Sequence, residues 1–298
     1  MPRAVMLCIL LPLFTSPAAA QQPPLKVFIS ADMEGIAGVV TPEQLGPSGF
    51  EYGRFREFMT NEVIAAIEGA REAGATEIVV ADSHGNMQNL LIELLPADVT
   101  LVRGSPRPLS MMEGIDSTFD AALFIGYHAA ATNPEGVRAH TMSSARYAAV
   151  ALNGEPIAES GMNAAIAGHF GVPIVMVSGD DVAVAEVQAL VPGVEGAVVK
   201  RALGFHAAAT ITPAAARELI RERARAGVAR RNEIRAHALR TPVRLDLTFK
   251  NYRPAEILAW LPGVERPAAR TIAYTAEHIL DISRFLVFVG VFTADLDP

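Results

Sequence analysis

Cysteine is almost absent from this 298-residue sequence. The only one, Cys8, lies in the N-terminal stretch MPRAVMLCILLPLFTSPAAA, which starts basic, continues apolar and ends in small residues. This order is typical of a secretory signal peptide over residues 1–20, with cleavage near Ala20, and proline interrupts the stretch too soon for a membrane span. We therefore expect a periplasmic or secreted protein whose mature chain has no disulfide, no thiolate metal ligand and no membrane span.

A surplus of basic charge is also missing. The chain has 25 Lys and Arg against 32 Asp and Glu, a formal net charge of -7, and loss of Arg3 with the signal peptide makes it -8. No basic excess remains to neutralise phosphates, which argues against nucleic acid as a partner. The one basic stretch, 217–235, interleaves arginines with glutamates at helical spacing, which favours a solvated helix over a binding patch.

The glycine motif of dinucleotide-binding folds is absent too, because no G-x-G-x-x-G follows the first apolar run. Four runs are apolar throughout rather than alternating, as in strands buried on both faces: 25–30, 77–82, 121–127 and 173–179. Helical patterns lie between them, over 50–74 and 161–171. This alternation predicts an α/β fold with a largely parallel, twisted sheet flanked by helices on both faces.

The pattern changes near residue 205. A helix is predicted over 213–238 and a half-exposed strand over 243–249, and further helix and strand material follows in 252–260 and 271–292. We assign 25–205 to an α/β core. Residues 206–298 are either the last part of the same domain or a smaller α+β subdomain, and the sequence leaves both interpretations open.

Two acids interrupt the first apolar run, in VFISADMEGIAGVV. Side chains two apart on an extended chain point to the same face, so Asp32 and Glu34 project into one small volume. Two like charges held that close favour a bound cation. The alternative is that Asp32 is a turn or cap acid and that Glu34 is solvated.

Candidate ligands also follow the next two strands. Ligands of open parallel sheets bind beyond the carboxyl ends of the strands, and His84 follows 77–82 while His128 follows 121–127. Each has a simpler interpretation as a hydrogen-bonded turn residue, and Glu159 has one as a first-turn acid of the helix at 161–171. Three strand ends that each deliver a ligand type nevertheless favour a metal site.

Carboxylates and imidazoles without sulfur suit zinc or manganese rather than calcium. Asp32, Glu34, His84, His128 and one further acid supply five ligands. Five are too many for one catalytic zinc with an open position, but suit two metals that share a carboxylate. A site of this kind would make 25–205 the metal-binding catalytic part of the chain.

Four stretches carry a resemblance to a known family: SADMEGIAG, ADSHGNMQNL, RPLSMMEGIDSTFDAALFIGYHA and NGEPIAESGMNAAIAGHFGVPIVMVSGDD. In this order they resemble the D-aminopeptidase family of zinc metallopeptidases, over roughly residues 25–290. The resemblance implies two zinc ions per chain and a metal-bridged hydroxide that releases N-terminal D-amino acids, such as D-Ala, from short peptides. It also implies a homo-oligomer ring, which is a decamer in the family's type member.

The resemblance further implies a role for each site residue. Asp32 would be the bridging carboxylate, with Glu34 and His84 completing one zinc site. His128 and Glu159 would complete the other. His140, in VRAHTM, would be a catalytic histidine beside the metals, as an acid, an oxyanion stabiliser or a nucleophile.

Two other functions stay open from the residues alone. The first is a dinuclear metallohydrolase of another class, such as a phosphoesterase or another amidase. No Lys or Arg cluster surrounds the predicted ligand loops, although Arg103 and Arg107 lie in a loop without a role. The second is a non-catalytic exported binding protein, which would be expected to lack an open metal position or His140.

Overall fold

The computed structural model describes Met1 and residues 24–292, so the predicted signal peptide lies outside the described residues except for Met1. The larger sheet has the order β3-β2-β1-β4-β7-β8-β9, and every pair is parallel except β8 with β9. Its strands are β1 Lys26–Ala31, β2 Glu77–Asp82, β3 Thr100–Val102, β4 Ala121–Tyr127, β7 Ile174–Asp180, β8 Glu195–Gly204 and β9 Ala207–Thr210. The predicted largely parallel sheet is therefore confirmed.

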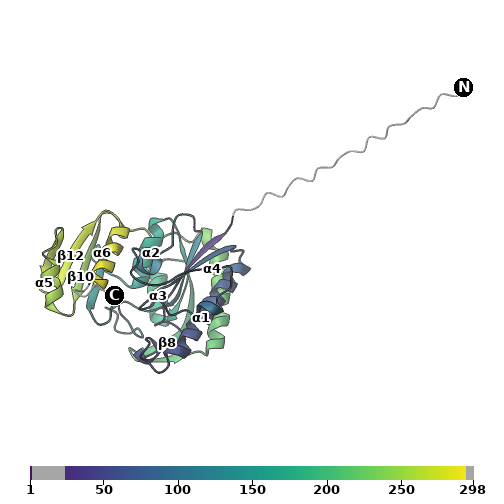
Figure 1. The fold of residues 1–298 in the computed structure, drawn as a ribbon, viewed down its shortest axis with the longest axis horizontal. Coiled ribbons are helices and arrows are strands. Elements are labelled where there is room, and N and C mark those ends of the chain that lie inside the picture. Colours follow the sequence, from purple (N-terminus) through teal and green to yellow (C-terminus); the bar gives the residue numbers. More distant parts are fainter. Residues whose placement is uncertain (2–23, 293–298) are drawn as a thin grey trace.

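Helices flank this sheet on both faces, which is why its central strands β4 and β7 are buried along their whole length (Figure 1). The helices are α1 Tyr52–Glu72, α2 Glu159–His169, α3 Asp181–Leu190 and α4 Pro213–Ala229. Helix α1 packs against α4, and α2 contacts α3. Short 3-10 turns lie at Pro42–Gln44, Ile92–Leu94, Ser110–Met112 and Arg231–Glu233.

Helix α4 is shorter than predicted. It begins at Pro213, after the N-cap Thr212, and ends at Ala229 rather than at 238. Its buried stripe of Ala216, Ile220, Ala224 and Val228 has no apolar continuation at the next turn, where the chain has Arg231 and Asn232. The charge spacing persists beyond the helix, but the apolar face that holds it against the sheet does not.

A second, antiparallel sheet has the order β11-β12-β10-β5-β6. Its strands are β5 Tyr147–Leu152, β6 Glu155–Pro156, β10 Val243–Phe249, β11 Val264–Ala268 and β12 Thr271–Ala276. Side chains of β10 alternate between buried and half-buried, as predicted. This sheet takes strands from both sides of residue 205.

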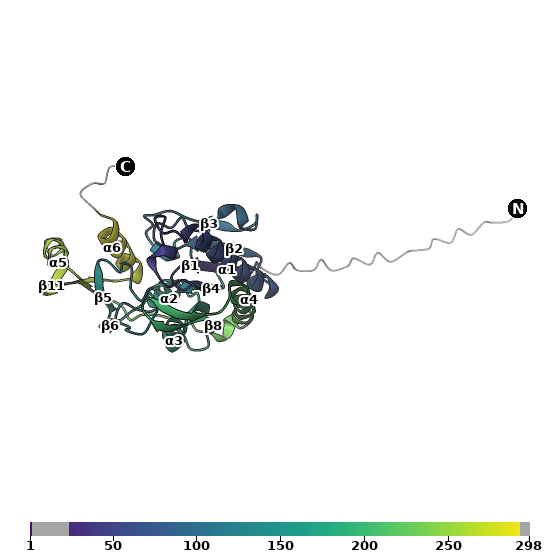
Figure 2. The ribbon, with the colours of Figure 1, turned by 90° about the horizontal axis from the view of Figure 1, so that it is seen from below.

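Helices α5 Tyr252–Leu258 and α6 Ile279–Val291 accompany the second sheet, which lies beside the first (Figure 2). Helix α6 contacts β10 and β12, and it also contacts α2 and the turn at Ser110–Met112. It therefore connects the two sheets. Within the described residues, no helix combines the length and apolar composition that crossing a bilayer requires.

The strand order places a crevice at the carboxyl ends of β1 and β4. The chain adds β2 and then β3 on one side of β1, and it adds β4, β7 and β8 on the other. Loops on either side of such a switch point diverge and leave room for a ligand. Four of the six predicted site residues follow these strands: Asp32 and Glu34 after β1, His84 after β2 and His128 after β4.

Candidate metal centre

Two glycines allow the loop after β1 to lie directly against the end of β4. The Asp32 N–H donates to the Ile125 carbonyl at 2.8 Å, and the Gly35 N–H donates to the Gly126 carbonyl at 2.7 Å. A Cβ at Gly35 would lie 2.1 Å from the Tyr127 carbonyl oxygen, and one at Gly126, where φ is +71°, would lie 2.2 Å from that of Asp32. The glycines of DMEG and GYH thus bring the acids beside His128.

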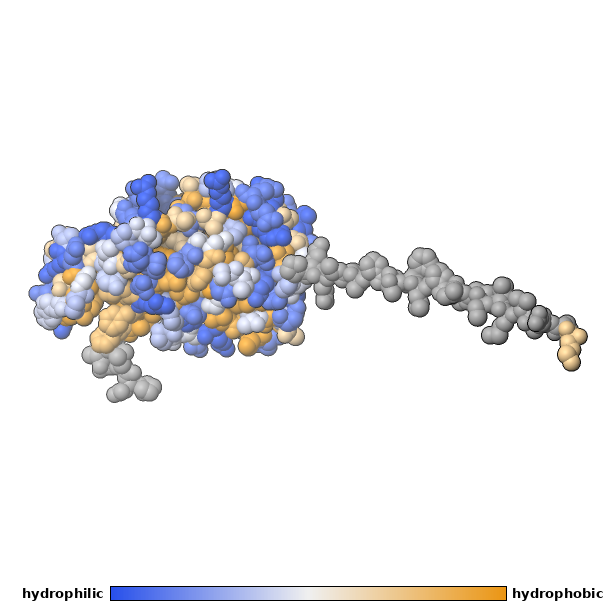
Figure 3. Space-filling model, turned by 90° about the horizontal axis from the view of Figure 1, so that it is seen from above, coloured by the Kyte–Doolittle hydropathy of each residue, from blue (hydrophilic) through white to orange (hydrophobic). Residues whose placement is uncertain are grey.

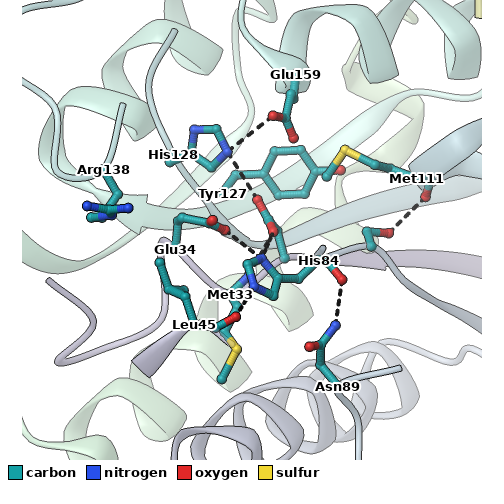
Figure 4. A network of polar contacts seen from close by, with 12 residues as sticks. Met33, Glu34, Leu45, His84, Asn89, Met111, Tyr127, His128, Arg138 and Glu159 are labelled. Carbon is teal, nitrogen blue, oxygen red and sulfur yellow. Dashed lines mark hydrogen bonds and ion pairs between the residues drawn. The ribbon is translucent and has the colours of Figure 1, made fainter. Parts of the chain in front are cut away.

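The structure brings all six predicted site residues together, and Figure 4 labels four of them: Glu34, His84, His128 and Glu159. His84 Nδ1 lies 3.3 Å from Asp32 Oδ1 and 2.9 Å from Glu34 Oε2. His128 Nε2 lies 3.3 Å from Asp32 Oδ2 and 3.5 Å from Glu159 Oε1. His140 Nε2 lies 3.6 Å from the same Glu159 oxygen. Asp32 therefore turns one carboxylate oxygen toward each of two histidines.

Each of the three histidines has one ring nitrogen held by a backbone carbonyl. His84 Nε2 donates to Leu45 at 2.7 Å, His128 Nδ1 to Ala129 at 3.1 Å, and His140 Nδ1 to Arg138 at 2.8 Å. A carbonyl oxygen only accepts, so these nitrogens carry the proton. The other nitrogen of each ring faces the carboxylates, the arrangement that orients metal-binding histidines.

Two buried atoms in the centre have no hydrogen-bond partner: Asp32 Oδ2 and His128 Nε2. With the ring proton on Nδ1, a lone pair of His128 faces a carboxylate, which is unfavourable in a buried site unless a cation lies between them. Ligand atoms of Asp32, Glu34 and His128 lie within 4.8 Å of one another, and so do those of His128, His140 and Glu159. This nitrogen and oxygen donor set fits zinc.

The charges of the site shift the pKa values of its members. Burial raises the pKa of Asp32, and the nearby Glu34 raises it further. Burial also opposes ionisation of Glu34, yet His84 holds the pKa of Glu34 well below its usual value. Burial alone lowers the pKa of His84 and His128, but the facing carboxylates raise both well above the ordinary value. The buried carboxylates thus strongly favour positive charge at the centre of the site.

Glu159 connects the centre to the loop of His140. It is the first residue of α2, so the helix begins two residues before the predicted 161. Its Oε1 atom accepts the Met142 N–H at 2.6 Å. Arg138 and Met142, on either side of His140, have φ values of +53° and +63°, which are uncommon for residues with a side chain. This loop is held in a constrained conformation.

Lys200 supports the site and was missed by the sequence analysis. Its fully buried Nζ atom donates to the carbonyls of Glu34, Ile36 and Val39. The lysine thus holds the loop that carries two predicted ligands. A signal existed, because Lys200 interrupts the apolar residues of AVVKRAL.

A cavity of about 330 Å³ opens above the centre. Five of the six site residues line it: Asp32, Glu34, His84, His140 and Glu159. Its lining also includes Leu286 and Val287 of α6, Arg107 and Arg146. The candidate centre thus forms the floor of a pocket between the two sheets, and the pocket is large enough for a small ligand.

Comparisons with known proteins agree with this geometry. Residues 25–288 match the family model described as D-aminopeptidase. The chain is 38% identical over 261 residues to a D-aminopeptidase of Bacillus subtilis (strain 168), which covers 86% of this chain and 93% of that protein.

The fold agrees as well. It matches the solved structure of Zn-dependent D-aminopeptidase DppA from Bacillus subtilis, a self-compartmentalizing protease, with a TM-score of 0.85 and 34% identity. The match covers 91% of this chain and 99% of that one. With motifs, sequence and fold in agreement over most of its length, the chain belongs to the D-aminopeptidase family.

Proposed function

We propose that this protein is a dinuclear zinc-dependent aminopeptidase that releases N-terminal D-amino acids, such as D-Ala, from short peptides. One observation carries the proposal. Three histidines, each fixed by a backbone carbonyl, turn their free nitrogens toward three buried carboxylates, around two atoms without hydrogen-bond partners. Family membership supplies the reaction class.

Five residues would hold the metals. Asp32 would contribute to both sites, because its two oxygens face different histidines. Glu34 and His84 would complete one site, and His128 and Glu159 the other. Zinc bound there would polarise the scissile carbonyl and lower the pKa of a water molecule.

His140 is placed to move a proton. Its Nδ1–H is committed to the Arg138 carbonyl, so only Nε2 faces the pocket. A proton on Nε2 would pass to the leaving amine as the peptide C–N bond breaks, or would stabilise the oxyanion. The half-buried ring stays in contact with the pocket, unlike that of His128. The nucleophilic alternative would need the same nitrogen unprotonated.

A paired assay tests the proposed reaction. We expect the purified protein, loaded with zinc, to hydrolyse D-alanine p-nitroanilide, and to hydrolyse the L-alanine compound at least about tenfold more slowly, a difference of about 1.4 kcal/mol. A chelator should abolish the activity, and added zinc should restore it. Equal rates on both stereoisomers would remove the proposed specificity.

The phosphoesterase alternative is tested in the same experiment. Arg107 and Arg146 line the pocket, and arginine is a common phosphate ligand. Rapid hydrolysis of p-nitrophenyl phosphate, without hydrolysis of either anilide, would favour that alternative. Two zinc ions bound without any hydrolysis would instead favour the binding protein.

We also propose export and self-association. The stretch 1–20 supports a periplasmic or secreted location, because its basic start, apolar centre and small C-terminal residues match a signal peptide. A self-compartmentalizing relative supports a homo-oligomer ring, with a decamer as the hypothesis to test.

An exposed apolar surface offers a place for a second copy. An apolar groove of about 460 Å³ lies between α5 and α6, lined by Phe249, Ile257, Leu258, Leu261, Phe288 and Phe292 among others. Trp260, nearby on the chain, is 76% exposed. Apolar surface is visible beside the end of α6 in Figure 3. Patches of this kind commonly mark protein interfaces.

A further inference from the structure

Arg107 is a buried cation in the wall of the pocket, on the loop between β3 and β4. Only 6% of the residue is exposed. Its Nη2 atom donates to the Asp82 carbonyl at 2.8 Å and its Nη1 atom to the Val102 carbonyl at 3.2 Å, while Nε has no partner. A guanidinium stays protonated at neutral pH. Arg107 therefore carries a full positive charge into the protein.

Among the residues that the structure describes, no carboxylate oxygen forms a salt bridge with Arg107, although Asp82 and Glu113 lie close enough to favour its charged form. The nearest acids are engaged elsewhere: Asp82 accepts from the backbone of Asn89 and Leu90, and Glu113 accepts from the Leu109 N–H. A buried guanidinium that is bonded only to backbone carbonyls can still accept a carboxylate partner from a ligand. The side of Arg107 that remains accessible lines the pocket.

The position of Arg107 relative to the metal centre suits a short peptide. Its guanidinium donates to the carbonyl of Asp82, which precedes His84 by two residues. The backbone from Asp82 to His84 spans at most about 7 Å. A di- or tripeptide whose first peptide bond lies at the metal centre has its terminal carboxylate one or two residues farther along. This length is comparable with that of the backbone between Asp82 and His84. Arginine also matches the planar geometry of a carboxylate.

We propose that Arg107 binds the C-terminal carboxylate of the substrate and thereby makes the enzyme selective for di- and tripeptides with a free carboxylate. This inference rests on the proposed aminopeptidase function. The competing explanation is structural, because the two bonds to backbone carbonyls also hold the loop of Arg107 against β2 and β3. A structural role would affect all substrates alike, whereas carboxylate binding affects only those that have the carboxylate.

The first test uses the wild-type protein. We expect kcat/KM for D-alanyl-D-alanine to exceed that for its C-terminal amide by about 10- to 100-fold, mainly through KM. Equal kcat/KM values for the two would overturn the role of Arg107. Hydrolysis of neither compound would instead remove the proposed function, so the two failures are distinguishable.

Substitutions of Arg107 then test whether this residue causes the preference for a free carboxylate. Two variants are useful here: Arg107→Met, and Arg107→Gln, which retains hydrogen-bond donors. In both, we expect the ratio of kcat/KM for D-alanyl-D-alanine to kcat/KM for its amide to fall to near one, while the amide is still hydrolysed. Arg103→Met is the matched control, because Arg103 is exposed on the same loop. It should keep the wild-type ratio.

Binding gives a readout independent of turnover. The dissociation constant of a non-cleavable dipeptide analogue, measured by calorimetry, should rise about 10- to 100-fold in Arg107→Gln and stay unchanged in Arg103→Met. A parallel loss on acid and amide substrates, with unchanged binding of the analogue, would show that Arg107 only stabilises its loop. If Arg107→Met does not fold, Arg107→Gln and the comparison of acid and amide substrates in the wild type still test whether Arg107 binds the carboxylate.

Discussion

The imidazole rings of His128 and His140 stack with their centroids 4.0 Å apart and an angle of 8° between the planes. Both turn Nε2 toward the same oxygen of Glu159, at 3.5 and 3.6 Å. The two residues differ in depth, because His128 is 1% exposed whereas the pocket reaches His140. We therefore propose a metal-ligand role for the buried ring and proton transfer for the accessible one.

Alanine substitutions separate these roles. His84→Ala and His128→Ala should lose zinc and activity together, because each removes a proposed ligand from a buried, acidic site. His140→Ala should keep its zinc and lose about 10²- to 10⁴-fold in kcat, the usual size of a proton-transfer contribution. Elemental analysis and a D-alanine anilide assay measure both. If His140→Ala lost zinc as readily as His128→Ala, His140 would be a ligand.

Lys200 positions the ligand loop. Lys200→Met removes the lysine donor from three buried carbonyl groups, of which that of Ile36 keeps the Val39 N–H. We expect the free energy of unfolding to fall by about 3 kcal/mol or more. Zinc affinity should fall about 10- to 100-fold, as for other residues that orient ligands. Urea unfolding and zinc titration measure the two effects.

Lys250→Met is the control for this substitution. Lys250 also donates to a backbone carbonyl, that of Ser144, but at the surface. Its replacement should change stability by no more than about 0.5 kcal/mol and leave zinc affinity unchanged. Unaltered zinc affinity in Lys200→Met would contradict the positioning role.

Glu62, in α1, should make stability depend on pH. Burial raises the pKa of Glu62 from 4.5 to about 7, although the Ala37 N–H, Lys200 and Arg217 favour its ionised form. Because the folded protein holds this proton more tightly than the unfolded chain does, the stabilisation is complete below pH 4.5. It is lost as pH rises through about 7.

Glu62→Gln should remove this dependence, because glutamine can accept the same Ala37 N–H without ionising. Between pH 5 and pH 8 the stability of the wild type should fall by about 2 to 3 kcal/mol relative to the variant. Urea unfolding at both pH values measures the difference. Glu68→Gln, an exposed site on the same helix, should show no such trend. Parallel pH profiles for wild type and Glu62→Gln would contradict an ionisable Glu62 in the core.

The exposed apolar residues Ile257, in α5, and Trp260, just after it, should control self-association. We expect the wild type to sediment as a large, uniform oligomer, and the double variant Ile257→Glu with Trp260→Glu to dissociate, because it places charges in the apolar contact. Analytical ultracentrifugation distinguishes the states. A wild type that is monomeric at micromolar concentration would contradict the ring, and an unaffected double variant would place the contact elsewhere.

The ligand positions were predictable because their signals are local. Asp32 and His128 follow directly after apolar runs, and His84 follows the end of β2 by two residues. Parallel strands bring their carboxyl ends to one edge. The structure places these side chains in contact, as this argument requires. Their roles as ligands remain predictions.

The second sheet was harder to predict from the sequence. Strand β5, with the sequence YAAVAL, is rich in alanine and shows no clear alternation, and its partner β10 lies far along the chain. Such a strand is fixed by its distant partner rather than by its own sequence. The clearest local signal was that of β10, in the alternation of VRLDLTF, and the strand material expected in 271–292 includes β12.

Two buried basic side chains show a different limit of prediction from the sequence. Lys200 and Arg107 are both buried, although lysine and arginine are usually exposed. Burial of Lys200 depends on three carbonyls of the loop at 34–39, and that of Arg107 on the carbonyls of Asp82 and Val102. These partners are remote in sequence or set by loop geometry, so the residue type alone could not reveal them.

The most direct test of the metal centre is a crystal structure of the zinc-loaded protein with anomalous data collected at the zinc edge. We expect two anomalous peaks per chain, with the Asp32 carboxylate in contact with both, His84 at one and His128 at the other. A single peak, or peaks that do not touch Asp32, would contradict the dinuclear centre.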